Sequence, residues 1–179
     1  MEFQQSKTFG NMQKAYEREL MISTLYDIFS DQAVVEQYIQ ISNIFKTIER
    51  NNKEHARIFL RRLNNGIIPE TQSNLLSSAN FETDTAALYR NYGNTAKDEN
   101  YNDIAALFNG IANISLNHDL LLRTQYDNVL RQEVFCKPQQ TLWICQQCGN
   151  ILAGDCAPTI CPICGFPQGY YMVYTGTTT

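Results

Sequence analysis

Apolar residues recur at intervals of three and four along residues 33–63, a spacing that predicts one face of an α-helix. The same spacing returns in residues 101–126, and each position there follows its counterpart by 63 residues. The two stripes are Tyr38, Ile41, Phe45, Ile48, Asn52, His55, Phe59 and Leu63, then Tyr101, Ile104, Phe108, Ile111, Ser115, His118, Leu122 and Tyr126. We therefore expect two helical hairpins of one design.

The hairpins are expected to form a four-helix bundle. The four helices should lie near residues 11–30, 33–63, 73–93 and 99–132. The stretch "DQAV", residues 31–34, is interpreted as the first turn. Gly66 should end the second helix and Pro69 should open the third. A link at residues 64–73 allows three connections: a ferritin-like crossover, an up–down turn, or exchange of hairpins between two chains.

Several polar residues fall on the inward stripes at one predicted height. They are Glu19, Asn52, His55, Glu82, Thr85, Ser115 and His118. A buried carboxylate is unfavourable unless it is paired or binds a metal. Two glutamates and two histidines that converge from four helices are ligand types of a carboxylate-bridged di-iron bundle.

The composition changes near residue 136, because all six cysteines and the single tryptophan lie at or after that point. We expect a helical domain at residues 1–135 and a small cysteine-rich domain at 139–179. Cys145-x2-Cys148 and Cys161-x2-Cys164 predict a tetrahedral four-thiolate site for iron or zinc. Cys136 and Cys156 lie outside that motif, and Cys156 is interpreted as a small buried side chain.

The charge and hydropathy of the chain exclude some classes of partner. A net charge of −4 without a basic stripe argues against nucleic-acid binding. No apolar run approaches membrane-spanning length, and the first residues lack a signal-peptide pattern. We expect a cytoplasmic, reducing location, where cysteines are metal ligands or free thiols more often than disulfides.

Taken together, these residues resemble the rubrerythrin family, in which a ferritin-like di-iron domain precedes a rubredoxin-like domain. The resemblance covers nearly the whole chain and implies a mainly α fold. It implies that iron cycles between ferric and ferrous forms at the four cysteines. It also implies a homodimer, an electron-donor partner protein and reduction of hydrogen peroxide. The implied remnant of the helical metal site is Glu19, His55, Glu82 and His118.

The chain departs from the family pattern at three ligand positions. The family carries Glu-x-x-His on the second and fourth helices, whereas this chain has Asn52 and Ser115 in place of the two bridging glutamates. Thr85 replaces a carboxylate of the third helix. Two unit charges about 4 Å apart repel by about 4 kcal/mol at an effective dielectric constant of about 20, and divalent ions repel more strongly.

Three states of the helical site are considered. We favour an empty site, then a site with a single metal, and last a di-iron centre. The protein would then transfer electrons through its four-cysteine iron centre, with peroxide reduction weakened or lost. One alternative is a zinc-stapled helical binding or scaffold protein without redox activity. Another is a working di-iron peroxidase whose site has been rebuilt.

Overall fold

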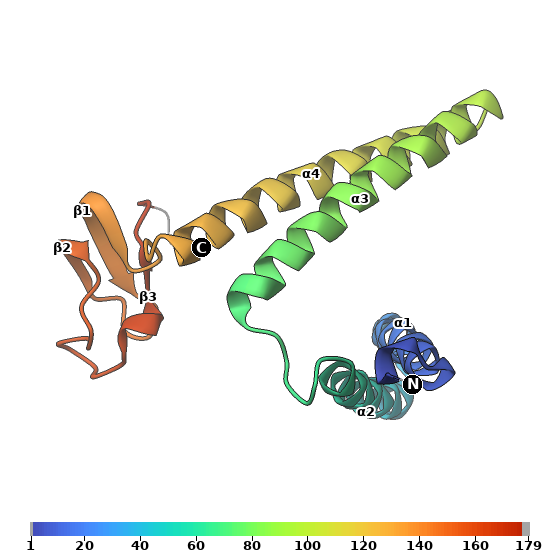
Figure 1. Ribbon diagram of the computed structural model, residues 1–179, viewed down its shortest axis with the longest axis horizontal. Helices are drawn as coiled ribbons and strands as arrows, with labels where there is room; N and C mark the ends of the chain where they lie inside the picture. Colours follow the sequence, from blue (N-terminus) through green and yellow to red (C-terminus); the bar gives the residue numbers. More distant parts are fainter. Residues whose placement is uncertain (1, 177–179) are drawn as a thin grey trace. The chain divides into compact units, whose positions relative to one another are not determined.

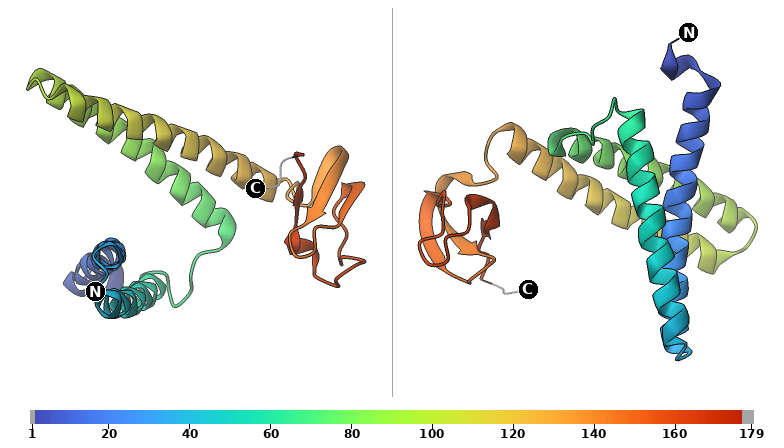
Figure 2. Two further views of the ribbon diagram at one scale, coloured as in Figure 1. Left: turned by 180° about the vertical axis from the view of Figure 1, so that it is seen from behind. Right: turned by 90° about the horizontal axis from the view of Figure 1, so that it is seen from below.

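The computed structural model describes residues 2–176 and contains four long helices followed by a small antiparallel sheet (Figure 1). The helices are α1 (Lys7–Val35), α2 (Ile39–Leu63), α3 (Thr71–Asp98) and α4 (Asn102–Leu130). The chain divides into two compact units, Met1–Pro69 and Glu70–Thr179, and each is described by itself. In each unit two long helices run side by side in opposite directions (Figure 2). Among the residues described, no helix is long and apolar enough to cross a membrane.

The 63-residue repeat is confirmed in the backbone of the two turns. Gln37 lies in the left-handed region with φ 65°, and Asn100, 63 positions later, has φ 67°. The next residue closes each turn: the Tyr38 amide donates to the Ala33 carbonyl at 2.8 Å, and Tyr101 donates to Ala96 at 2.8 Å. The two hairpins therefore share one turn geometry as well as one stripe of side chains.

The predicted first turn was wrong. Residues 31–34 lie within α1, which continues to Val35. This stretch contains neither glycine nor proline, so nothing in it breaks a helix. The chain reverses where Gln37 takes the left-handed conformation that commonly ends helices.

The link between the hairpins is shorter than predicted. Gly66 has φ 91°, and its amide donates to the Arg61 carbonyl at 2.7 Å, which confirms it as the stop of α2. Pro69 precedes α3, which begins at Thr71. Only residues 64–70 therefore connect α2 to α3.

Small side chains fill the space between the two helices of each hairpin. The buried residues are Ser23, Ser30, Ala33, Ser42, Asn52 and Ala56 in the first hairpin, and Ala79, Ala86, Gly93, Ala96, Ala105, Ala112 and Ser115 in the second. Several recur every seven residues, as in the seam of a coiled coil. Small residues allow close approach of the helices, so this interface leaves the larger apolar side chains on other faces.

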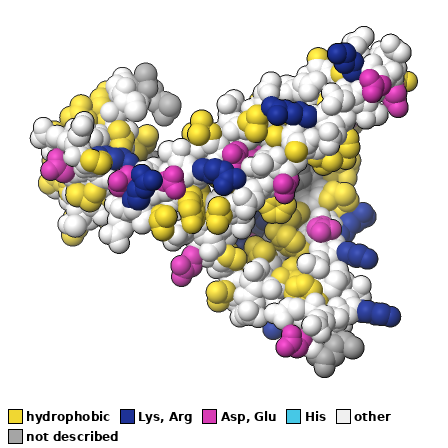
Figure 3. Space-filling model, turned by 45° about the horizontal axis from the view of Figure 1, so that its top comes forward, with side chains coloured by type: hydrophobic (Ala, Val, Ile, Leu, Met, Phe, Trp, Pro, Cys, Tyr) yellow, Lys and Arg dark blue, Asp and Glu magenta, His cyan; other side chains and the backbone are white. Residues whose placement is uncertain are grey.

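Those larger side chains remain exposed on both hairpins. Tyr38 and Ile41, which begin the predicted stripe, are 57% and 45% exposed. Similar residues are Leu25, Ile28, Phe29 and Ile44 in the first hairpin, and Phe81, Leu88, Ile104 and Leu107 in the second. Figure 3 shows hydrophobic side chains on the surface of the helices. Exposed apolar surface of this kind commonly marks an interaction face.

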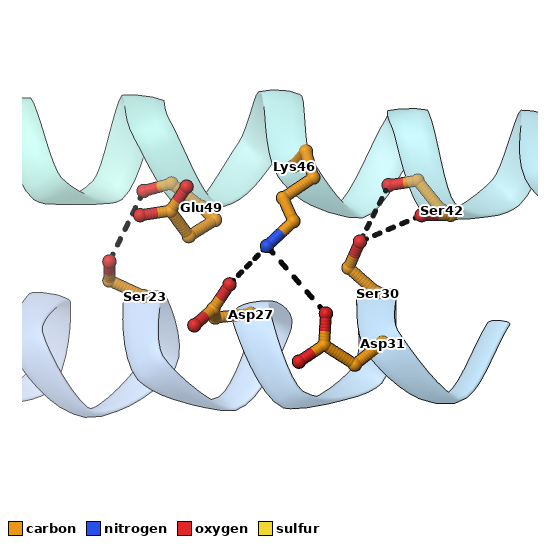
Figure 4. A network of polar contacts seen from close by, with 7 residues as sticks. All are labelled: Ser23, Asp27, Ser30, Asp31, Ser42, Lys46 and Glu49. Carbon is orange, nitrogen blue, oxygen red and sulfur yellow. Dashed lines mark hydrogen bonds and ion pairs between the residues drawn. The ribbon is translucent and has the colours of Figure 1, made fainter. Parts of the chain in front are cut away.

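Polar contacts fix the register of α1 against α2 (Figure 4). The Ser30 hydroxyl donates to the Ser42 carbonyl at 3.2 Å and lies 2.8 Å from the Ser42 hydroxyl. Lys46 reaches across to Asp27 by a hydrogen bond, and this contact is the main reason that the pKa of Lys46 is raised. These contacts hold α1 against α2, whose facing surfaces consist mainly of small side chains.

Enlarging a seam residue is expected to destabilise the second hairpin. Ala112 is fully buried, so Ala112→Leu should lower the free energy of unfolding by about 1–3 kcal/mol through overpacking. Urea unfolding followed by circular dichroism measures the change. Asn113→Leu adds a similar side chain at the next, exposed position and should have little effect. Equal effects from the two substitutions would contradict the assigned seam.

The sheet contains β1 (Cys136–Cys145), β2 (Ile151–Cys156) and β3 (Tyr171–Val173) in the order β2-β1-β3. Its core is formed by Trp143, Cys145, Ala157, Cys161 and Tyr171. The Trp143 indole donates to the Gly154 carbonyl at 3.0 Å, which satisfies its only donor. The core therefore includes two of the predicted metal ligands.

The expectation for the two remaining cysteines was wrong. Cys136 and Cys156 form a disulfide, and they lie opposite each other where β1 pairs with β2. Cys156 is exposed and ends β2, so it is not a buried side chain in a loop. Their proximity could not be read from the sequence, because it depends on a register irregularity between Cys136 and Thr141.

Candidate metal centres

Two similar turns present the four cysteines. In the first, the Gly149 amide donates to the Cys145 carbonyl at 2.8 Å, and the Cys145 amide donates to the Asn150 carbonyl at 2.9 Å. In the second, Gly165 donates to Cys161 at 2.9 Å, and Cys161 donates to Phe166 at 2.8 Å. The matching hydrogen bonds make the two turns a repeated unit.

A glycine is required at the same place in both turns. Gly149 has φ 77° and Gly165 has φ 73°, a region that side chains disfavour. In each turn the glycine directly follows the second cysteine of the pair, Cys148 or Cys164. The glycine reverses the chain so that both thiols of a pair face the same point.

The four sulfur atoms meet with the spacing of a tetrahedral metal site. The Sγ atoms of Cys145 and Cys164 are 3.7 Å apart, as are those of Cys148 and Cys161. All four lie within 4.8 Å of one another. With metal–sulfur bonds of about 2.3 Å, the edge of a tetrahedron is about 3.8 Å. The residues present therefore fit a bound iron or zinc ion.

Tyr171 supplies an interaction that the sequence motif did not reveal. Its buried hydroxyl has no hydrogen-bond partner of normal geometry among the described residues. The neighbouring Cys161 sulfur, and after it burial, raise the pKa of Tyr171 to about 12. The Tyr171 hydroxyl, helped by the Cys164 and Ile163 amides, lowers the pKa of Cys161 to about 6. A hydroxyl held beside the sulfur favours the thiolate that a metal requires.

Backbone amides also face the second sulfur of each pair. The Phe166 amide favours the Cys164 thiolate, but burial and the neighbouring sulfurs outweigh it and raise the pKa of Cys164 to about 12. The Asn150 amide has the corresponding place at Cys148, where burial and the neighbouring Cys161 and Cys145 sulfurs together outweigh it and raise the pKa. Thiols crowded in this way resist ionisation together unless a cation offsets their charge.

Removing the Tyr171 hydroxyl is expected to lower the reduction potential of the iron-loaded centre. A hydrogen bond to a thiolate stabilises the more negative, ferrous form, and its net value is about 0.5–1.5 kcal/mol. Tyr171→Phe should therefore shift the potential down by about 20–60 mV. Spectroelectrochemical titration measures this shift. Tyr170→Phe, at the neighbouring position, is the matched control, and an equal shift there would contradict the assignment.

Each hairpin carries one glutamate–histidine pair. Glu19 Oε2 lies 3.3 Å from His55 Nδ1, and Glu82 Oε1 lies 3.2 Å from His118 Nδ1. Both pairs join residues 36 apart and connect the two helices of their own hairpin. The histidine side chains are 53% and 51% exposed, so they are less buried within their hairpins than the sequence predicted.

The residues at the two positions where the resemblance implies bridging carboxylates are buried and neutral. Asn52 is 7% exposed and Ser115 is 4% exposed. The Asn52 Nδ2 atom has no hydrogen-bond partner among the described residues. An amide and a hydroxyl are both neutral, so neither offsets the charge of a cation. These positions therefore contribute no negative charge beside the Glu–His pairs.

Comparisons with known proteins agree with this architecture. The sequence profile described as "Rubrerythrin" matches residues 10–71, and that of the "Rubrerythrin, rubredoxin-like domain" matches residues 143–172. Rubrerythrin-1 of Clostridium acetobutylicum is 32% identical over 94% of both chains. Rubrerythrin of Clostridium perfringens is 34% identical over 96% of both chains.

A solved structure described as a mixed valant state of nigerythrin shares 20% sequence identity and has a TM-score of 0.35. The match covers 94% of this chain and 87% of that one. The assignment rests instead on the sequence relatives, which align along nearly the whole chain at more than 30% identity. The chain therefore belongs to the rubrerythrin family.

Proposed function

We propose that this protein transfers electrons through a rubredoxin-type iron centre held by Cys145, Cys148, Cys161 and Cys164. The sulfur spacing and the Tyr171 interaction support this assignment. Bound iron would supply a one-electron ferric–ferrous couple at these thiolates. The protein residues fix the ligand geometry, stabilise the thiolate of Cys161 and keep Trp143 packed against the site. The functional domains would be residues 1–135 and 139–179.

In the helical domain, we propose that peroxide reduction is weak or lost. The observation that carries this proposal is the buried, neutral pair of residues Asn52 and Ser115 beside the two Glu–His pairs. Without bridging carboxylates, two divalent cations repel each other with little compensation. The remnant set Glu19, His55, Glu82 and His118 then holds no metal or a single one.

A homodimer with exchanged hairpins explains the short link. Placing both Glu–His pairs level in a ferritin-like bundle requires a rise of about 12 Å from His55 to Leu63 and about 17 Å from Thr71 to Glu82. The eight Cα–Cα steps from Leu63 to Thr71 extend at most about 29 Å, which the combined rise alone uses up, so an in-chain crossover has no length left for the lateral step between helices. A hairpin from a second chain can take the place of the second hairpin in the four-helix bundle, with the same helix directions. It would also cover the exposed apolar faces of the first hairpin.

Mixing isotopically labelled and unlabelled chains tests this assembly. Exchanged hairpins must leave their partner chain before new dimers form, so mass spectrometry should detect mixed dimers only slowly, on the timescale of helix unfolding. A monomer in solution, or mixing within seconds, would contradict hairpin exchange.

The partner of the iron centre is proposed to be an electron-donor protein in the cytoplasm. The second candidate function, a zinc-stapled binding or scaffold protein, is favoured by one observation: the sulfur spacing fits zinc equally well. Colour separates the two, because a ferric four-thiolate centre is red and bleaches on reduction, whereas zinc is colourless. A colourless, fully metal-loaded protein purified from its own host would support the scaffold.

Stopped-flow mixing of the reduced protein with hydrogen peroxide tests the loss of activity. We expect a chemical reductant to reduce the four-cysteine centre rapidly and reversibly. Reoxidation by peroxide should be no faster than that of a four-thiolate iron centre without a helical domain. Reoxidation at an enzyme-like rate, about 1–1000 s⁻¹, would establish a working peroxidase instead.

A further inference from the structure

The Cys136–Cys156 disulfide lies at the edge of the sheet domain, outside the core that surrounds the four-cysteine site. Cys136 is half-buried, whereas Cys156 is exposed. On β1 Lys137 is half-buried and residues 138–140 are exposed, and no residue of β1 between Cys136 and Thr141 has a register partner on β2. Of the two cysteines, Cys156 is therefore the one that a reagent from solvent reaches more easily.

We propose that Cys136 and Cys156 form a second redox centre, a two-electron thiol–disulfide couple that exchanges with dithiol proteins. The proposal rests on the cytoplasmic location proposed above. In reducing compartments disulfides are rare, and those that form are usually transient and redox-active. An exposed disulfide in such a protein is a substrate for thiol exchange rather than a permanent cross-link.

The exchange begins at the accessible sulfur. A thiolate of the partner attacks Cys156 Sγ, forms a mixed disulfide with it, and displaces Cys136, which leaves as a thiolate and takes up a proton. The partner's second thiol then attacks the partner's first sulfur, which is bonded to Cys156 in the mixed disulfide. This step releases Cys156 as a thiolate, which is protonated in turn. Two thiols of the partner become one disulfide, and two electrons with two protons reach this chain. The reverse sequence oxidises it.

The couple is connected mechanically to the four-cysteine site. Phe135 and Ala157 are the chain neighbours of the two cysteines, and the Ala157 amide donates to the Phe135 carbonyl at 2.8 Å. Ala157 belongs to the buried core with Cys145 and Cys161, and Phe135 packs against that core. The disulfide also closes a loop that contains Cys145 and Cys148. Opening it therefore loosens the chain around the first metal-binding turn.

Differential alkylation of the zinc-loaded full chain tests the couple. Zinc protects the four ligand cysteines and has no redox chemistry of its own. As the ratio of reduced to oxidised glutathione rises, Cys136 and Cys156 should become open to alkylation together, and oxidised glutathione added before the alkylating reagent should restore the disulfide and protect both. Mass spectrometry of peptides identifies each site. The result does not depend on iron or peroxide, so it can fail while the proposed electron transfer stands, and the reverse also holds.

Two outcomes would overturn the proposal. Resistance of both cysteines to alkylation at every glutathione ratio would identify a permanent cross-link. Alkylation of both under fully oxidised glutathione would show that no couple forms. Cys136→Ser and Cys156→Ser serve as a matched pair: oxidised glutathione should capture Cys156 in the first variant several-fold faster than Cys136 in the second. Equal rates, or faster capture of Cys136, would contradict attack at Cys156.

Discussion

Placing glutamate at both Asn52 and Ser115 is expected to create a two-metal site in the helical domain. The change supplies two negative charges beside the Glu19–His55 and Glu82–His118 pairs. Relieving a repulsion of about 4 kcal/mol corresponds to an affinity gain of about a thousandfold for the second cation. Iron content should rise from about one to about three per chain, and peroxide should reoxidise the protein at a measurable rate.

A matched variant separates charge at these positions from charge in general. Asn51→Glu with Asn117→Glu adds the same two carboxylates to exposed positions of the same helices. This control should leave the iron content unchanged. Thermal unfolding by circular dichroism verifies that the Asn52→Glu, Ser115→Glu double variant keeps its helices. A folded double variant that gains no iron would contradict the role assigned to Asn52 and Ser115.

Removing the metal from the four cysteines is expected to unfold the sheet domain while the helices persist. Two of the five core residues, Cys145 and Cys161, are ligands, so the metal and the core form one cooperative unit. Structural four-ligand sites bind zinc with about 10–16 kcal/mol, far more than so small a core supplies alone. Chelation of the metal, or Cys161→Ser, should therefore disorder this domain.

Trp143 reports this change because it is the single tryptophan of the chain and is fully buried in the same core. Its fluorescence should move to the red as water reaches the indole, while the far-ultraviolet circular dichroism of the helices changes little. Cys136→Ser opens the disulfide but leaves the ligand set intact, so it should keep the metal and shift the fluorescence far less than metal removal does. Native emission from the metal-free protein would show that the core folds without its ion.

The sequence predicted the helical repeat because the apolar and polar positions of the stripe that begins at Tyr38 return after 63 residues. It did not reveal which face closes each hairpin. Ser23, Ser30 and Ala86 are too small to stand out in a hydrophobic pattern, yet they line the interface between the paired helices. The larger stripe that begins at Tyr38 and Ile41 dominates the periodicity, and those two side chains are exposed.

The four cysteines were predictable because the ligand spacing and the following glycines are local features of the sequence. Tyr171 and the Cys136–Cys156 disulfide were not, because both depend on contacts between strands. Tyr171 reaches its site through the pairing of β3 with β1. Cys136 meets Cys156 through the pairing of β1 with β2. Strand register depends on tertiary packing, which one sequence specifies only weakly.

The total of iron and zinc per chain tests the central claim most directly. The protein should be purified anaerobically from its own host and analysed for both elements against quantitative amino-acid analysis. With neutral residues at positions 52 and 115, we expect about one metal ion per chain, and about two if the Glu–His set retains a single ion. A value of about three would mean that two cations remain together among the helices without bridging carboxylates, and would contradict the account.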